Sequence, residues 1–162
     1  LFLPGSRSGG YDPGKGSIGW PMDLYTKLEQ LFVSHELRIV YAFGSKAERL
    51  HAFILGIQSE LDLSGSDIDL AVLPKDGRSF RLRNQIELGC EIEDLLRISG
   101  VDIVNLNQAP PALAAQAVMG IVLWTEDPDF ESEFQLWVLR KYSDALPLDK
   151  ERAELIIHHQ GA

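Results

Sequence analysis

The sequence predicts an α/β fold of the α+β type, in which a small mixed β-sheet is flanked by helices within one domain. Short runs rich in β-branched and aromatic residues alternate along the chain with longer segments whose apolar residues recur at helical spacing. The chain has 162 residues, of which 45% are apolar and 24% are charged. This length and composition suit a single soluble domain with a hydrophobic core of its own.

The composition argues against several classes of protein. Cys90 is the only cysteine, so the chain has neither a disulfide framework nor a zinc-type cysteine cluster, and a cytoplasmic location fits best. We expect Cys90 to be a small buried residue of a helix. The sequence contains no apolar run long enough to span a bilayer. The net charge of -9 argues against general nucleic-acid binding, whereas a basic protein partner or a polyanion bound through cations stays open.

Residues 1–21 differ from the rest of the chain in composition. They contain six glycines and three prolines and show no apolar periodicity. We interpret them as a flexible arm, either vector-derived or upstream of the natural start. Residues 22–126 are predicted to form the main domain. Residues 127–162 are predicted to form C-terminal helices that pack on that domain or on a partner.

Helices and strands alternate in the remaining chain. The apolar spacing and the turn residues predict helices over residues 22–35, 46–58, 79–99 and 110–119, and strands over residues 37–43, 67–73, 101–106 and 121–124. Gly100 is expected to end the third helix. Asp127, followed by Pro128, is expected to begin a further helix as its N-cap. After Pro147 we expect a separate short helix.

Two aspartates interrupt the second predicted strand. Because side chains alternate along a strand, Asp67 and Asp69 share one face, although aspartate is uncommon in strands. Asp102 interrupts the next strand in the same way, and Gly44-Ser45 ends the first. If these strands are neighbours, three carboxylates converge beside a Gly-Ser turn, and two divalent cations would relieve their repulsion. Such a pair of ions supports displacement at phosphorus. A simpler alternative is that the aspartates lie on the solvated face of an edge strand and bind no ion.

These motifs resemble those of a known superfamily. Gly44-Ser45, then Asp67-x-Asp69, then Asp102, each placed at a strand, resemble the signature of the DNA polymerase β nucleotidyltransferase superfamily. The strand sequences around these aspartates are similar to those of the minimal nucleotidyltransferases. Among those, the chain is most similar to the MntA-type antitoxins, which are encoded beside HEPN-domain toxins.

The resemblance, which covers residues 22–124, implies a palm-like nucleotidyltransferase fold and a magnesium-dependent reaction. AMP would pass from ATP to a hydroxyl group of a HEPN-type toxin, on a tyrosine, and would inactivate that toxin. Asp102 would also act as the base for the acceptor hydroxyl. The residues that the resemblance assigns to two Mg²⁺ ions are Asp67, Asp69 and Asp102, and those that it assigns to the triphosphate are Gly44 and Ser45.

The chain departs from the family pattern between the Gly-Ser turn and the paired aspartates. The 22 positions from Ser45 to Asp67 are more than is usual in the family. In place of a small, basic and glycine-containing run, the turn is followed by Lys46-Ala47-Glu48-Arg49. The run therefore places the acidic Glu48 near the expected triphosphate.

Two other functions stay open. One is a noncatalytic binding module that neutralises its partner by contact alone. The other is a nucleotidyltransferase for a small molecule such as an aminoglycoside, which would need a second substrate-binding domain that residues 127–162 are too short to supply. An aromatic stripe of Phe130, Phe134 and Trp137 predicts a core face of the C-terminal helix or, alternatively, a surface for a partner.

Overall fold

The computed structural model describes residues 21–61, 67–77 and 79–159, and it confirms the predicted mixed sheet flanked by helices. The predicted arm, apart from Pro21, lies outside the described residues, as does the predicted turn at residues 64–66. The elements in chain order are α1 (Pro21–Ser34), β1 (Leu37–Phe43), α2 (Ala47–Ile54), β2 (Ile68–Pro74), α3 (Leu82–Leu96), β3 (Val101–Asn105), α4 (Pro111–Val118), β4 (Ile121–Thr125) and α5 (Pro128–His159).

The sheet has the strand order β3-β2-β1-β4. β1 pairs with β2 and with β4 in antiparallel orientation, whereas β2 and β3 are parallel. A parallel pair needs a crossover connection, and α3 supplies it. β1 is a central strand and is buried along most of its length, which its apolar sequence Leu37–Phe43 allows. β3 lies at one edge of the sheet and β4 at the other.

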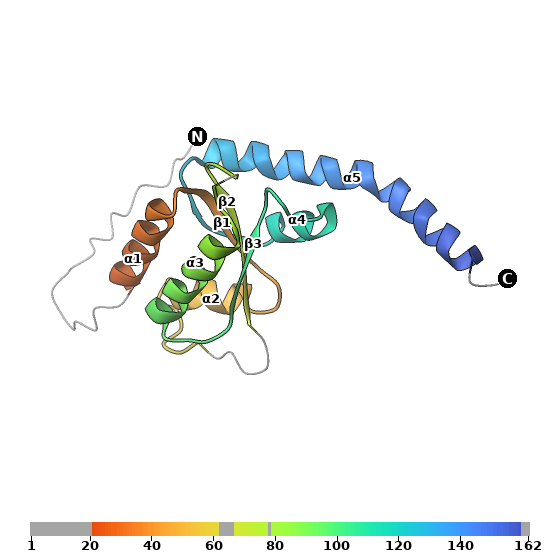
Figure 1. Ribbon diagram of the computed structural model, residues 1–162. Coiled ribbons are helices and arrows are strands. Elements are labelled where there is room, and N and C mark those ends of the chain that lie inside the picture. The colour runs from red at the N-terminus through yellow and green to blue at the C-terminus, as the bar shows by residue number, and fades with distance from the viewer. Residues whose placement is uncertain (1–20, 62–66, 78, 160–162) are drawn as a thin grey trace, which may run out of the picture.

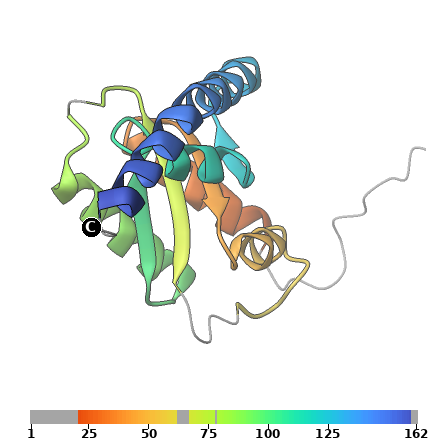
Figure 2. The same ribbon diagram turned by 90° about the vertical axis from the view of Figure 1, so that its right-hand side faces the viewer.

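Helices cover the two faces of the sheet unequally (Figures 1 and 2). On one face, α1, α2 and α3 enclose a core to which β2 contributes Leu70 and Val72. On the other face, α4 and the first part of α5 enclose a second core, to which β2 contributes Ala71 and Leu73. Because side chains alternate along the strand, Asp69 projects on the same side as Ala71 and Leu73, the side of α4 and α5.

The C-terminal segment forms one helix, so the predicted break at Pro147 is wrong. Asp127 caps α5 as predicted, since its Oδ1 accepts hydrogen bonds from the backbone amides of Asp129 (3.0 Å) and Phe130 (3.2 Å). The helix then continues from Pro128 to His159 through the proline. A proline inside a helix removes one backbone hydrogen bond, but it can be accommodated by a kink when the flanking residues remain helical. Figure 1 shows α5 passing α4 and continuing beyond the rest of the fold.

The aromatic stripe of α5 is divided between the core and the surface. Phe130 and Phe134 are half-buried and pack against the second core, which confirms the core interpretation for these two residues. Trp137 stacks on Phe134 with a centroid distance of 5.9 Å, but 55% of its surface is exposed. The stripe therefore leaves the core at Trp137.

Three details of α3 differ from the prediction. The helix ends at Leu96 rather than at residue 99, and the left-handed residue that follows it is Arg97, with φ of 56°, rather than Gly100. Glycine is the usual residue at this position, but other residues adopt it at a cost of about 1–2 kcal/mol. Cys90 is exposed, so its predicted burial is wrong. It lies out of phase with Leu88 and Ile92, which form the buried face of the helix.

Candidate active site

The beginning of β2 and the beginning of β3 place two of the expected aspartates side by side. Asp69 is directly opposite Asp102 in the parallel pair, and on its other side it is opposite Phe43, the last residue of β1. This register brings the Gly44-Ser45 turn, which follows β1, to the same end of the sheet. The structure therefore gathers three separate segments of the chain at one site, as the sequence predicts for neighbouring strands.

The site is open on the side of α4 and α5. In Figure 2, the beginnings of β2 and β3 lie at the bottom of the sheet, below both of these helices. Asp67 and Asp102 are exposed, and Asp69 is half-buried. Asp67 directly precedes β2 and lies two residues before Asp69, so both side chains project on this open side.

Two glycines lie against the carboxylates. Gly44 has φ of 75°, and a Cβ atom added to it would lie 2.5 Å from Oδ2 of Asp69. Gly100 has φ of 92°, and an added Cβ atom would collide with Oδ1 of Asp67. Both positions therefore need glycine for two reasons, the left-handed backbone and the close approach of a carboxylate. They leave space in which carboxylate oxygens can face a ligand.

Gly100, which local sequence patterns predict as a helix end, lies instead against Asp67 in the site. The signal that could have found it is the parallel alignment of the two aspartate strands. Ile68 pairs with Val101, and the Ile68 amide donates a hydrogen bond of 2.8 Å to the Gly100 carbonyl. That alignment places Gly100 beside Asp67.

The aspartates influence one another electrostatically. The pKa of Asp69 is raised above its ordinary value, first because the carboxyl group is partly desolvated, and then because the charges of Asp102 and Asp67 lie nearby. Nearby like charges and partial burial both disfavour the ionised form of the Asp69 carboxyl group. The cluster therefore favours binding of a cation at neutral pH.

The residues after Gly44 lead into the N-terminus of α2. Ser45 is exposed, and the helix begins at Ala47, three residues after the Gly44 that lies against Asp69. Backbone amides at a helix start are suited to binding phosphate oxygens. Lys46 directly precedes the helix and is only 7% exposed.

The donor set of the site fits a hard divalent cation. Three carboxylate groups supply oxygen ligands of the kind that Mg²⁺ prefers, and the two glycines leave room beside them. Within the described residues, however, no three His, Cys, Asp or Glu side chains already stand close enough to form a metal-binding group. Mg²⁺ commonly completes its coordination with water and substrate phosphates.

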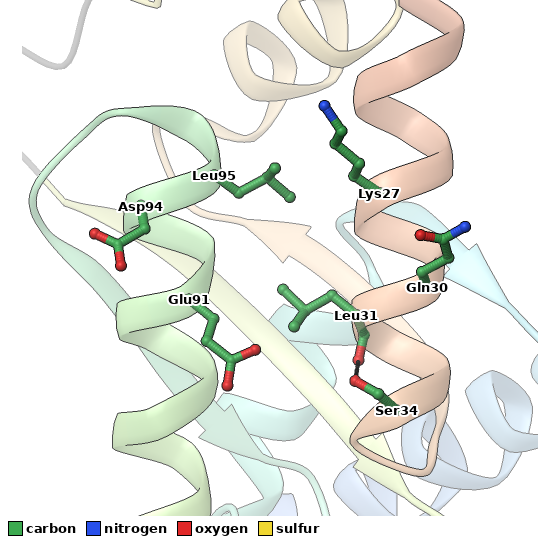
Figure 3. A pocket seen from close by; sticks show the side chains of 7 residues that line it. All are labelled: Lys27, Gln30, Leu31, Ser34, Glu91, Asp94 and Leu95. Atoms are coloured by element: carbon green, nitrogen blue, oxygen red, sulfur yellow. Dashed lines mark hydrogen bonds between the residues drawn. The ribbon is translucent and has the colours of Figure 1, made fainter.

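A separate cavity of about 630 Å³ lies between α1 and α3 (Figure 3). Leu31 and Leu95 line it together with Glu91, Asp94 and Lys27. It is formed by helices that cover the opposite face of the sheet and includes none of the expected site residues. Lys27 forms an ion pair with Asp23 of its own helix at 2.5 Å, so its charge is already balanced. The negative charges of Glu91 and Asp94 therefore make this cavity unfavourable for a triphosphate.

The family of the chain follows from a comparison with protein families. The profile described as "Polymerase beta, Nucleotidyltransferase" matches residues 26–129, which include both strands of the aspartate cluster and the Gly44-Ser45 turn. The chain belongs to this nucleotidyltransferase family. A search of curated proteins found no significant match.

Solved structures of toxin–antitoxin complexes share the fold. A mutant MntA–HepT complex is 25% identical to this chain, covers 85% of it and 98% of its own chain, and has a TM-score of 0.59. A toxin–antitoxin structure with AMP-PNP is 26% identical, with 85% and 98% coverage and a TM-score of 0.58. A complex of tri-AMPylated Shewanella oneidensis HEPN toxin with MNT antitoxin is 24% identical, with 87% and 99% coverage and a TM-score of 0.58.

In the part of the chain that the structure describes, no helix combines the length and the apolar character that a membrane span needs.

Proposed function

We propose that this nucleotidyltransferase transfers AMP from ATP to a tyrosine hydroxyl of a HEPN-type toxin and thereby acts as its antitoxin. The observation that carries the proposal is the placement of Asp69 opposite Asp102, with Asp67 two residues before it and Gly44 against its carboxylate. This end of the sheet provides carboxylate ligands for metal ions. The chain leads from Gly44 into the N-terminus of α2, where backbone amides suit phosphates. The proposed reaction consumes ATP and is therefore expected in the cytoplasm.

The aspartates divide the chemical work. Asp67 and Asp69 would hold two Mg²⁺ ions, and Asp102 would bind one of them. When bound, such ions neutralise the charge of the phosphates and stabilise the attacking and leaving oxygens. The raised pKa of Asp69 supports this role, because a cation would offset the partial burial and the neighbouring charges that disfavour its ionised form.

The acceptor hydroxyl would be activated by Asp102. Its exposed carboxylate lies beside Asp69 at the open side of the site, where an acceptor can approach. The hydroxyl oxygen forms a bond to the α-phosphorus, the bond between that phosphorus and the pyrophosphate group breaks, and the hydroxyl proton passes to Asp102. The pyrophosphate then leaves from the side of Gly44, Ser45 and the N-terminus of α2.

The acceptor and the nucleotide are proposed from the related complexes. One toxin–antitoxin structure contains AMP-PNP, an analogue of ATP, and supports ATP as the donor. In the Shewanella oneidensis complex the HEPN toxin carries the AMP groups. We carry the same class of acceptor over to this chain.

The proposal is tested by incubating the purified chain with its HEPN-type partner, MgCl₂ and ATP labelled on the α-phosphate. We expect label on the partner with wild-type protein, and a loss of label with EDTA or with Asp67→Asn. Asp94→Asn is the matched control, because Asp94 is an exposed aspartate on α3 that lines the separate cavity. Equal labelling by wild type and Asp67→Asn would refute the proposed site.

Label that appears on an added aminoglycoside instead of on the partner would refute the proposed acceptor. The same reaction mixture therefore distinguishes protein modification from small-molecule modification. It requires only separation of the labelled products by size.

A further inference from the structure

The short connection from α3 to β3 leads into the aspartate cluster (Figure 1). It consists of residues 97–100. Its last residue, Gly100, lies so close to Asp67 that an added Cβ atom would collide with the carboxylate. Two residues later, Asp102 stands opposite Asp69 in the sheet. The placement of this connection therefore influences how the carboxylates of the cluster are spaced.

One side chain of α3 holds the end of this connection. Oε1 of Glu93 accepts hydrogen bonds from the backbone amides of Gly100 (2.7 Å) and Val101 (3.1 Å). The backbone carbonyl of Glu93 accepts a further hydrogen bond of 3.0 Å from the amide of Ile98. Hydrogen bonds to a carboxylate are stronger than those between neutral groups. Glu93 therefore fastens the connection to the helix near both of its ends.

Gly100 is also bonded on its other side, to β2. Its carbonyl accepts a hydrogen bond of 2.8 Å from the amide of Ile68. Ile68 lies between Asp67 and Asp69 in the sequence. The hydrogen bonds thus form a continuous path from the carboxylate of Glu93, through the peptide groups of Gly100, to the strand that carries the paired aspartates.

Glu93 acts on the cluster through the backbone. α3 packs against the face of the sheet on which Val101 and Ile103 project, and a Cβ atom added to Gly89 would lie 3.4 Å from the Val101 carbonyl oxygen. Side chains alternate along β3, so Asp102 projects on the opposite face. The carboxylate of Glu93 therefore supports the start of β3 from the side of the helix, while the aspartates face the open side of the site.

We propose that Glu93 is a positioning residue for the divalent cation of the active site. Its hydrogen bonds hold the start of β3, so that Asp67 and Asp102 keep a fixed place beside Asp69. The proposal rests on the proposed function, which assigns this cation to the three aspartates. Residues that orient metal ligands without touching the metal change its affinity by about 10–100-fold when they are replaced.

Two substitutions separate the reach of the Glu93 side chain from its charge. Glu93→Gln removes the charge but keeps an amide oxygen at the same place, and both hydrogen bonds already end on a single oxygen. Glu93→Asp keeps the charge but shortens the side chain, so the oxygen no longer reaches both amides. Glu93→Ala removes both properties. We expect Glu93→Gln to behave as wild type and the other two variants to share one defect.

The measurement is binding of Mn²⁺, a paramagnetic substitute for Mg²⁺, to the purified full chain, followed by electron paramagnetic resonance. We expect Glu93→Ala to raise the dissociation constant of Mn²⁺ by about tenfold or more. Glu93→Asp should shift it in the same direction, and it replaces Glu93→Ala should that variant fail to fold. The Mg²⁺ concentration that gives the half-maximal rate of AMP transfer to the HEPN-type partner should rise in parallel.

Asn105→Ala is the matched control, because Asn105 stabilises the opposite end of β3. It is 4% exposed, its side chain donates a hydrogen bond of 3.2 Å to the Phe80 carbonyl, and its Oδ1 accepts one of 3.0 Å from the Asn107 amide. We expect this variant to lose thermal stability but to bind Mn²⁺ as wild type does. If Asn105→Ala weakens Mn²⁺ binding as much as Glu93→Ala does, general destabilisation explains the effect and the proposal is overturned.

Amide hydrogen exchange of the metal-free protein, measured by NMR, tests the hydrogen bonds themselves. We expect the amides of Gly100 and Val101 to exchange faster in Glu93→Ala than in wild type, and to keep their protection in Glu93→Gln. Unchanged exchange of both amides in Glu93→Ala would overturn the proposal, because Glu93 would then not hold the start of β3.

The outcomes separate this inference from the function on which it rests. If wild type binds Mn²⁺ but transfers no AMP, the proposed function fails, while the dissociation constant of Glu93→Ala still supports or overturns the positioning role. If wild type transfers AMP, while Glu93→Ala and Glu93→Asp bind Mn²⁺ as wild type does, the function stands and this inference alone is overturned. Weak binding by Glu93→Gln together with normal binding by Glu93→Asp would also overturn it, since charge would then be the cause. If wild type binds no Mn²⁺, this inference fails together with the assignment of the cation.

Discussion

Replacing Gly44 with alanine adds one methyl group directly against the carboxylate of Asp69. The added Cβ would lie 2.5 Å from Oδ2 of Asp69, and the backbone φ of 75° is left-handed. The substitution therefore has two separable effects. One is backbone strain at residue 44, and the other is displacement of a carboxylate that the proposed function assigns to a metal ion.

The size of each effect follows from the geometry. A left-handed backbone costs a residue with a Cβ atom about 1–2 kcal/mol, which lowers Tm by roughly 2–8 °C in a domain of this size. Relief of the contact moves the Asp69 oxygen by about 0.8–1.1 Å, because comfortable carbon–oxygen contacts are about 3.3–3.6 Å. Misplacement of a catalytic group by about 1 Å lowers the rate by about 100-fold, equivalent to roughly 2.7 kcal/mol of transition-state stabilisation.

Gly56→Ala is the matched control for this substitution. Gly56 has φ of 70° and follows α2, so the control carries a similar backbone strain away from the aspartates. The assay combines thermal unfolding with the rate of AMP transfer to the partner. We expect both variants to lose stability to a similar extent and only Gly44→Ala to lose about 100-fold in kcat/KM. A folded Gly44→Ala protein with a rate within about threefold of that of Gly56→Ala would refute the reasoning.

Three further predictions concern charge and packing. The folded-state pKa of Asp69 is raised, so its favourable contribution to stability is present below the unfolded pKa of about 3.9 and is lost as pH rises through the folded pKa. At pH 7 the ionised Asp69 therefore destabilises the folded protein. Asp69→Asn is expected to raise Tm at pH 7 in EDTA and to have less effect near pH 4. The Tyr41 hydroxyl donates a 2.7 Å hydrogen bond to Glu131, so Tyr41→Phe should cost about 1.5–3 kcal/mol in urea unfolding at pH 7. Burial and Glu131 raise the pKa of Tyr41, so wild type should lose this advantage as pH rises above about 10. Leu88 is fully buried, and Leu88→Ala should cost about 2–5 kcal/mol in the same unfolding experiment, whereas a loss below about 1 kcal/mol would contradict the packing described for α3.

Local sequence patterns predicted the strands and the acidic positions well. The bounds of β1 match the prediction because its β-branched and aromatic residues have no competing helical spacing. The period of two predicts Asp67 and Asp69 on one side of the strand. Asp127 caps α5 as expected. These features depend on a few neighbouring residues, so they can be read from the chain without knowledge of its tertiary structure.

Features that depend on distant residues could not be read in this way. Tertiary packing fixes the parallel register that sets Asp69 opposite Asp102. From the sequence, the convergence of the aspartates followed only if the strands were assumed to be neighbours. The same register gives Gly100 its place against Asp67, whereas a local reading made it a helix end. The continuity of α5 through Pro147 likewise overrides a local preference for a break.

The central claim is that the chain neutralises its partner by catalysis at the aspartate cluster. It is tested most directly by producing the HEPN-type toxin in cells together with wild-type protein or with Asp67→Asn, and by measuring growth and the AMP content of the recovered toxin. We predict that wild type restores growth and yields AMP-modified toxin, whereas Asp67→Asn still co-purifies with the toxin but leaves it unmodified and active. Full restoration of growth by Asp67→Asn, with unmodified toxin, would contradict the claim and establish neutralisation by contact alone.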